Sequence, residues 1–193
     1  MKKLSVTIII SILIFLIYAC NNNDSKQYEF DSSVITNDTC IVVSHNNYFY
    51  ECYGDFMNPV ELENHFSKQF LMHKEITYVY SDSSMIDTLY RVVRDNSFIK
   101  FLYTNSTDEK ESMQIVSARI NNPELVMTNG LKTGLEKRVV LAMLFGKGYN
   151  LDLNKIDNFQ IITALEGLWI NLRFSEDRLD RISIDSDYQV NQK

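Results

Sequence analysis

The sequence predicts an α+β fold in which helices pack on one face of an antiparallel sheet. Two segments combine helix-capping residues with apolar residues at helical spacing, and seven segments are rich in strand-forming residues. Gly and Pro are scarce, at 6 and 2 of 193 residues, so we expect regular structure with few special turns. The composition, 45% hydrophobic and 23% charged, is that of an ordinary globular protein.

The first helix is predicted over residues 58–72. Asn58 is a favourable N-cap, Pro59 suits the first helical position, and Glu61 stands where a capping box has an acid. Apolar residues at four-residue spacing form one face of this helix, namely Leu62, Phe66 and Phe70.

The second helix is predicted to begin after Thr133 and to end at Gly146. Thr133 precedes Glu136 by three residues, which is the spacing of a capping box, and Gly146 is a suitable C-terminal residue. Its apolar face is formed by Leu135, Val139, Met143 and Leu144.

Seven segments are predicted to be strands, separated by gaps rich in Ser, Asp, Asn and Thr that suit antiparallel hairpins. They are residues 75–80, 85–94, 97–104, 112–120, 159–165, 168–174 and 178–184. Several of them alternate: Leu168 and Ile170 fall on one face of their strand, and Trp169 and Asn171 on the other. One apolar and one polar face is typical of an antiparallel sheet covered on a single side.

A further hairpin is predicted at the start of the folded region, with strands at residues 41–43 and 48–50 and a turn near Asn46. This register places Cys40 opposite Cys52, at a separation that a disulfide can bridge. We therefore predict a Cys40–Cys52 disulfide; the alternative is a pair of buried thiols.

Residues 1–19 are predicted to be a secretory signal peptide. Lys2 and Lys3 form a basic start, and the apolar run over residues 4–17 is shorter than the roughly 20 residues that a membrane-spanning helix needs. The polar residues 20–38 are predicted to form a tether between the membrane and the folded region.

The end of this signal segment, "IYAC" at residues 17–20, resembles the lipobox of bacterial lipoproteins. Ile17 and Tyr18 depart from its commonest form, as in looser boxes of Bacteroidota-type lipoproteins. The resemblance implies acyl chains, such as palmitate, on Cys20 as a membrane anchor, and Asn21 in place of Asp favours the outer membrane. Whether the protein faces the periplasm or the cell surface stays open. An uncleaved anchor and plain secretion are the alternatives.

The charge excludes one class of partner. Without Lys2 and Lys3 the chain has 17 basic and 25 acidic residues, a net charge of −8. Binding to nucleic acid is not expected at this charge, and neither is attraction to anionic lipid headgroups. The acyl chains on Cys20 would therefore hold the protein on the membrane without electrostatic help.

The chain divides into two halves, residues 39–120 and 121–193, with a similar order of helix and hairpin. The stretch "TNGLKTGLEKRVVLAMLFG" in the second half resembles an element of β-lactamase-inhibitor-protein-like domains and of small outer-membrane-assembly lipoproteins. The match is carried by Gly130, Gly134, Leu135, Val139, Leu144, Phe145 and Gly146. The resemblance implies two helix-plus-sheet repeats with one open sheet face, and proteins that bind other proteins and are not enzymes.

No catalytic or metal-binding pattern stands out. The histidines His45, His65 and His73 lack the i, i+4 spacing of a helical metal site, and no serine stands in a Gly-x-Ser-x-Gly motif. We therefore expect no enzymatic activity, no metal and no cofactor.

Alternation places a candidate binding face on the polar side of the sheet. Its predicted members are Lys100, Arg119, Trp169, Arg173 and Arg181, together with Leu102. Trp and Arg are enriched at protein interfaces, although Arg and Lys are also common on exposed strands and a loop could cover Trp169. We expect a monomeric protein-binding module, inhibitor-like or scaffolding, for another envelope protein. An outer-membrane assembly factor and a surface glycan-binding lipoprotein are the alternatives.

Overall fold

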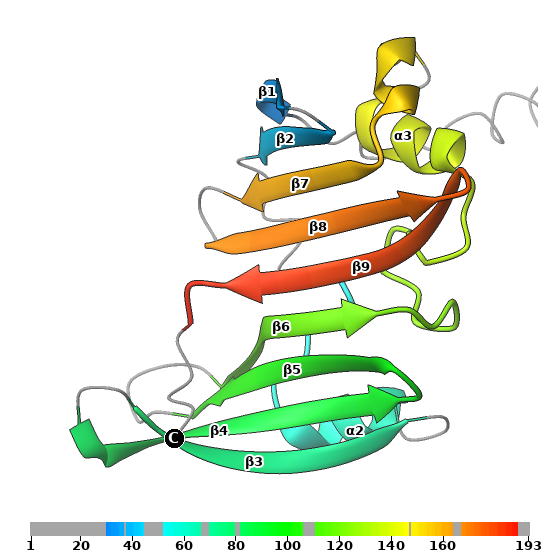
Figure 1. The fold of residues 1–193 in the computed structure, drawn as a ribbon. Helices are drawn as coiled ribbons and strands as arrows, with labels where there is room; N and C mark the ends of the chain where they lie inside the picture. The colour runs from blue at the N-terminus through cyan, green and yellow to red at the C-terminus, as the bar shows by residue number, and fades with distance from the viewer. Residues whose placement is uncertain are drawn as a thin grey trace, which may run out of the picture.

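The computed structural model describes residues 30–36, 38–44, 52–66, 70–79, 82–105, 111–146, 148–163 and 167–188. Their strands form one nine-stranded mixed sheet in the order β1-β2-β7-β8-β9-β6-β5-β4-β3 (Figure 1). Two short α-helices and a 3-10 helix accompany the sheet in this part of the chain. The protein is therefore mainly β, and the expected α+β architecture of two helix-plus-sheet repeats is wrong.

The strands fall into two groups along the sheet. Four consecutive strands make up one group: β3 (Leu71–Val79), β4 (Asp82–Arg94), β5 (Ser97–Thr104) and β6 (Ser112–Ile120). The other group joins the N-terminal and C-terminal strands: β1 (Phe30–Thr36), β2 (Thr39–Ser44), β7 (Asn158–Thr163), β8 (Leu168–Ser175) and β9 (Arg178–Ser186). The groups meet where β6 pairs with β9 over four residue pairs, so both halves of the chain share one sheet instead of forming separate repeats.

The N-terminal strands differ from the prediction. Strand β2 pairs with β1 in an antiparallel hairpin and with β7 in parallel, and the predicted partner strand at residues 48–50 lies outside the described residues. The tether expected to end at residue 38 also includes β1. The β-branched residues Val34, Ile35 and Thr36 suit a strand, and the exposed edge position of β1 tolerates the polar residues before them.

The two cysteines are buried as thiols, so the predicted disulfide is not formed. Cys40 lies between Ile35 of β1 and Phe159 of β7, and its cross-strand neighbours are therefore not the segment that contains Cys52. Burial raises the pKa of the Cys40 thiol. Both side chains are part of the apolar core and are not cross-linked.

The first helix, α2 (Pro59–Phe66), begins as predicted but ends early. Asn58 Oδ1 accepts from the backbone N–H of Val60 and of Glu61, both at 3.1 Å, and Glu61 Oε2 accepts from Met57 N–H at 2.9 Å. The helix does not reach residue 72, because the residues from Leu71 onwards join the sheet as β3.

The second helix, α3 (Lys137–Phe145), does not have the predicted capping box. Its N-cap is Glu136, without a side-chain cap, and Thr133 is buried and donates its hydroxyl to the Asn121 carbonyl at 3.3 Å. The β8–β9 turn caps the helix instead, because Lys137 N–H donates to the Asp177 carbonyl at 2.8 Å. The 3-10 helix η2 (Leu151–Lys155) follows and leads into β7.

The apolar core lies between the helices and one face of the sheet, with α2 behind β4 in the view of Figure 1. In one half, Phe66 of α2 and Phe56 pack against Phe101, with ring centroids 6.3 and 5.9 Å away. In the other half, Phe159 packs against Phe174 at 5.7 Å. The opposite face of the sheet, called the open face below, carries the residues considered next. No helix among the described residues is long and apolar enough to cross a membrane.

Candidate binding site on the open face

Burial along the strands defines the open face. In β8 the residues Leu168, Ile170 and Leu172 are buried in the core, whereas the residues between them are only partly buried. The same alternation and the strand registers place every predicted member of the binding face on the open face, namely Lys100, Leu102, Arg119, Trp169, Arg173 and Arg181. Whether this face binds a partner remains a prediction.

The strand register aligns these residues in rows that cross the sheet. One row runs from β2 to β9 and contains Thr39, Asn158, Arg173 and Arg181. The next row runs from β7 to β6 and contains Gln160, Asn171, Ser183 and Arg119. We call these eight residues the polar rows; they include three arginines and no carboxylate.

All of the polar rows except Arg119 line a shallow groove of about 370 Å³ that crosses β2, β7, β8 and β9, and Arg119 stands beside it on β6. Its floor is braced by side-chain contacts: Gln160 Nε2 donates to Asn171 Oδ1 at 3.1 Å, and Asn158 Nδ2 donates to Asp38 Oδ2 at 3.2 Å. Amides and hydroxyls line its length, and guanidinium groups lie at its β8–β9 end. The groove thus offers hydrogen-bond donors and positive charge together.

The three arginines of the polar rows lie on adjacent strands. Arg173 and Arg181 are direct cross-strand partners, and Arg119 stands opposite Ser183, diagonal to Arg181. Like charges placed opposite each other destabilise a sheet. Arg173 is compensated by an ion pair with Asp180, but the exposed Arg119 guanidinium has no hydrogen-bond or ion-pair partner within the part of the chain that the structure describes.

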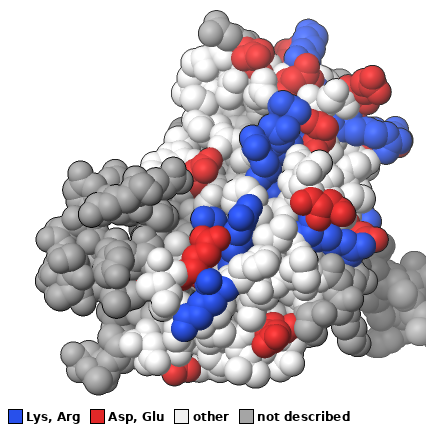
Figure 2. Space-filling model, turned by 60° about the horizontal axis from the view of Figure 1, so that its bottom comes forward, with Lys and Arg blue, Asp and Glu red and all other residues white. Residues whose placement is uncertain are grey.

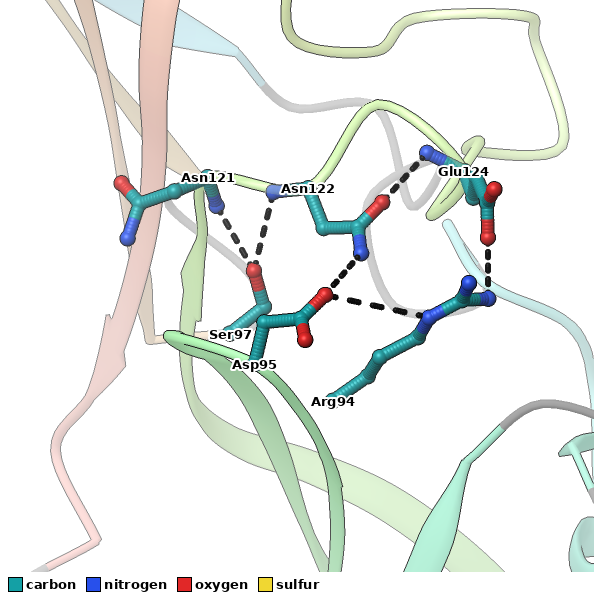
Figure 3. Close-up of polar contacts among 6 residues, drawn as sticks. All are labelled: Arg94, Asp95, Ser97, Asn121, Asn122 and Glu124. Carbon is teal, nitrogen blue, oxygen red and sulfur yellow. Dashed lines mark hydrogen bonds and ion pairs between the residues drawn. The ribbon is translucent and has the colours of Figure 1, made fainter.

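A hydrogen-bonded cluster behind the arginines holds the loop that follows β6 (Figure 3). The Ser97 hydroxyl oxygen accepts from the backbone N–H of Asn121 and of Asn122, both at 2.9 Å. Asn122 Nδ2 also donates to Asp95 in the β4–β5 turn, at 3.0 Å. The Asn121 side chain points away from the serine in Figure 3, and its Oδ1 accepts from Arg181 Nε at 3.2 Å. The cluster therefore fixes the acceptor that orients Arg181.

Arg94 completes this cluster on the side away from Asn121. It forms an ion pair with Glu124 and lies 3.9 Å from Asp95, and its guanidinium carbon is 5.4 Å from the centre of the Phe70 ring. These contacts tie the β4–β5 turn, the connector after β6 and Phe70, the residue before β3, into one unit. Because Asn121 begins this connector, the position of Arg181 depends on packing in the other half of the molecule.

Trp169 and Lys100 lie apart from the arginines. The cross-strand neighbours of Trp169 are Ile162 and Asp185, so no guanidinium group lies directly opposite it on these strands. Lys100 forms an ion pair with Glu75 at 2.9 Å. The predicted face is therefore two regions: an arginine cluster on β6, β8 and β9, and a row of mixed charge that contains Trp169 and Lys100.

Charges of both signs are spread over the surface. Figure 2 shows Lys and Arg side chains in a broken band across one side of the molecule, with Asp and Glu among them. Against this background, two adjacent rows that contain arginines but no carboxylate are distinctive in a chain with a net charge of −6.

Sequence reasoning missed the neutral members of the polar rows and one further arginine. Gln160, Asn171 and Ser183 occupy the polar positions of alternating strands, but only the register shows that they are neighbours. Arg91 pairs with Lys100 across β4 and β5, and its guanidinium lies 4.9 Å from the centre of the Phe98 ring. Polar residues at every second strand position were the available signal for these residues.

The histidines do not belong to a metal site among the described residues. His65 lies at the end of α2, His73 is exposed on β3, and His45 lies outside the described residues. Within the described ranges, no three His, Cys, Asp or Glu side chains gather as metal ligands. Lys137 is buried, with Nζ 2.7 Å from Asp157 Oδ1 and 2.8 Å from the Asn154 carbonyl, and ties α3 to the loop before β7. Cys20 also lies outside the described residues.

Comparison with known proteins gives no relative. No protein-family model, curated protein or solved structure matches the chain. The resemblance to bacterial lipoproteins and to β-lactamase-inhibitor-protein-like domains therefore remains a prediction from the sequence, and the two-repeat fold that it implied is replaced by a single mainly β sheet.

Proposed function

We propose that this chain is a non-catalytic binding protein of the cell envelope whose open face takes an acidic segment of another protein. The observation that carries the proposal is the cluster of Arg119, Arg173 and Arg181 in two rows that contain no carboxylate. Bringing like charges together costs free energy in the unbound protein, and an anionic partner would offset that cost.

The shape of the groove favours an extended segment as the ligand. The groove is shallow and crosses four strands, which are spaced about 4.8 Å apart. Asn158, Gln160 and Asn171 can hydrogen-bond backbone amides of any sequence, while the arginines select for Asp and Glu side chains. Affinity would therefore come from the amides and selectivity from the guanidinium groups.

The envelope location in this proposal rests on the N-terminal sequence. A lipid on Cys20 would anchor the chain to the outer membrane, and the residues between Cys20 and β1 would give the sheet some reach from the membrane surface. A binding module without its own enzymatic activity would then act on the partners that diffuse within that reach.

Site-specific photo-cross-linking tests the proposal. A photoreactive residue at Asn171, inside the groove, should form an adduct with one acidic protein, and the same residue at the exposed Glu63 of α2 should not. Arg119→Glu should abolish the adduct, because it reverses the charge of an arginine without a partner in the described fold. The matched charge reversal Lys155→Glu, on the exposed surface of η2, should leave the adduct intact.

The outcomes separate the candidate functions. Adducts at both positions, or an adduct that survives Arg119→Glu, would contradict the proposed face. An adduct with a membrane β-barrel would identify an assembly factor acting through the same face. No protein adduct, together with retardation on a polysaccharide affinity gel, would replace the proposal with glycan binding.

A further inference from the structure

A second part of the open face is apolar and covered. Leu89 of β4 pairs with Leu102 of β5 on the open face. Val92 and Ile99, each three residues away along its strand and therefore on the opposite face, belong to the core. Leu89 is nevertheless only 1% exposed, although it contributes nothing to the core cluster on the other face. Val116 of β6 is likewise buried outside that cluster.

A bulge in β6 shapes this apolar patch. The register between β5 and β6 shifts after Lys100, which pairs with Ser117, while Phe101 pairs with Ile115. Val116 is the extra residue, and a bulge removes its residue from the regular ladder of hydrogen bonds. The Val116 carbonyl accepts instead from the hydroxyl of Ser186 at 2.8 Å.

The chain that follows β9 crosses this part of the sheet. Tyr188 N–H donates to the Ser186 hydroxyl oxygen at 3.2 Å, and the Tyr188 hydroxyl donates to the Asp87 carboxylate of β4. Strands β6 and β5 lie between β9 and β4 in the sheet (Figure 1), so the two ends of this connection span both of them. The segment therefore lies across the region that contains Leu102 and Val116.

The phenol of Tyr188 donates to a charged acceptor, the Asp87 carboxylate. A hydroxyl that donates to a carboxylate forms a charge-assisted hydrogen bond, stronger than one between neutral groups. Burial and the Asp87 carboxylate both raise the pKa of Tyr188, so the phenol keeps its proton over the physiological range. Asp187 N–H still donates to the Gly167 carbonyl at 3.1 Å, and the contacts of Tyr188 with Ser186 and Asp87 hold the residue that follows.

We propose that the patch of Leu89, Leu102, Val116 and Asp87 is a docking site for an extended segment that presents a tyrosine, and that the chain's own Asp187 and Tyr188, directly after β9, occupy it as a detachable strap. A partner segment would have to place a phenol against Asp87 and apolar groups over Leu102 to replace the strap. The proposal is independent of the arginine cluster, because none of these four residues belongs to the polar rows.

The test separates the strap from its site. A chain that ends at Asp185 should bind a synthetic peptide of residues 186–193, measured by fluorescence anisotropy or calorimetry, whereas the full chain should bind it at least about tenfold more weakly because its own strap fills the site. A peptide with Tyr188→Phe should lose about tenfold in affinity, as should the shortened chain with Asp87→Asn. Glu63→Gln, on exposed α2, is the matched control and should bind normally.

Two results would overturn the proposal: no binding of the peptide to a folded shortened chain, or equal binding to the shortened and full chains. If the shortened chain does not fold, the full chain with Tyr188→Phe gives the answer by hydrogen exchange. Faster exchange confined to β4, β5 and the end of β9 would support a strap, and unchanged exchange would reject it.

Discussion

The half of the sheet formed by β3–β6 is built from consecutive antiparallel hairpins, whereas the half formed by β1, β2 and β7–β9 requires β2 to pair in parallel with a strand far along the chain. The open faces of the two halves differ as well. The first carries an apolar patch under the segment that follows β9, and the second carries the polar rows with their arginines. A single sheet thus presents two surfaces of different chemistry.

The difference follows from how each half closes its core. In the first half, α2 covers one face and the strap covers part of the other, so Leu89 can be buried away from the helices. In the second half, η2 and α3 cover one face and the described chain leaves the groove open on the other. The open positions of β7 and β8 along the groove are polar, namely Asn158, Gln160, Asn171 and Arg173, and they are available to a partner.

The largest expected effect comes from the two aromatic clusters. Phe101→Ala in the first half and Phe159→Ala in the second should each lower the free energy of unfolding by about 3–5 kcal/mol, because each removes a fully buried ring. Since the halves share one sheet, each variant should show one cooperative transition in urea, followed by circular dichroism. Two separate transitions would mean that the halves are independent domains.

An intermediate effect is expected at Gly167, which directly precedes β8 and contacts Asp187, the first residue of the strap. Gly167 has φ +60°, and a Cβ there would lie 2.9 Å from Asp187 Oδ2. Gly167→Ala should destabilise the protein by about 1–2 kcal/mol, from backbone strain and displacement of Asp187. Asp187→Gly should relieve part of this loss in the double variant. Full additivity of the two changes would show that the turn and the strap do not touch.

A smaller effect on stability, with a large one on binding, is expected at the arginine cluster. Arg119→Gln should change the free energy of unfolding by less than about 0.5 kcal/mol, because the side chain is exposed. Thermal unfolding measures the change in stability. Binding of the acidic partner should be weaker in this variant, and binding to the unchanged protein should weaken as the salt concentration rises. A large loss of stability would show that Arg119 has a structural role.

A modest gain in stability, with no effect on binding, is expected at the β8–β9 turn. Glu176 and Asp177 have φ of 50° and 56°, which favour Asn and Gly in a two-residue hairpin. Glu176→Asn with Asp177→Gly should raise the free energy of unfolding by about 0.5–1 kcal/mol. The Lys137 N–H bond to the carbonyl of residue 177 is kept, so a net loss would indicate that the turn's side chains hold α3.

Local patterns in the sequence were sufficient to predict part of this structure. Strands β5 and β6 have the predicted bounds, and alternation in β8 correctly assigned Trp169 and Arg173 to the open face. Hairpins depend on neighbouring residues, so their signals lie within one short stretch. The Asn58 cap was correct for the same reason.

Non-local pairing explains what the sequence did not predict. The parallel contact of β2 with β7 left Cys40 beside Phe159, which no short segment reveals. Thr133 and Glu136 have the spacing of a capping box, but the Asp177 carbonyl of the β8–β9 turn accepts from the first N–H of the helix instead. The position of Asp185 beside Trp169 likewise depends on the register between β8 and β9. A register shift of one residue would place Asp185 on the opposite face of the sheet.

The account depends most on β6 and β9 joining both halves into one sheet, and an engineered disulfide tests this directly. Ser117 and Asp185 are cross-strand partners on the open face, so Ser117→Cys with Asp185→Cys should form a disulfide on oxidation, detected by mass spectrometry. The matched pair Ser117→Cys with Ile184→Cys points to opposite faces and should stay reduced. A disulfide in the second pair, or none in the first, would contradict the continuous sheet.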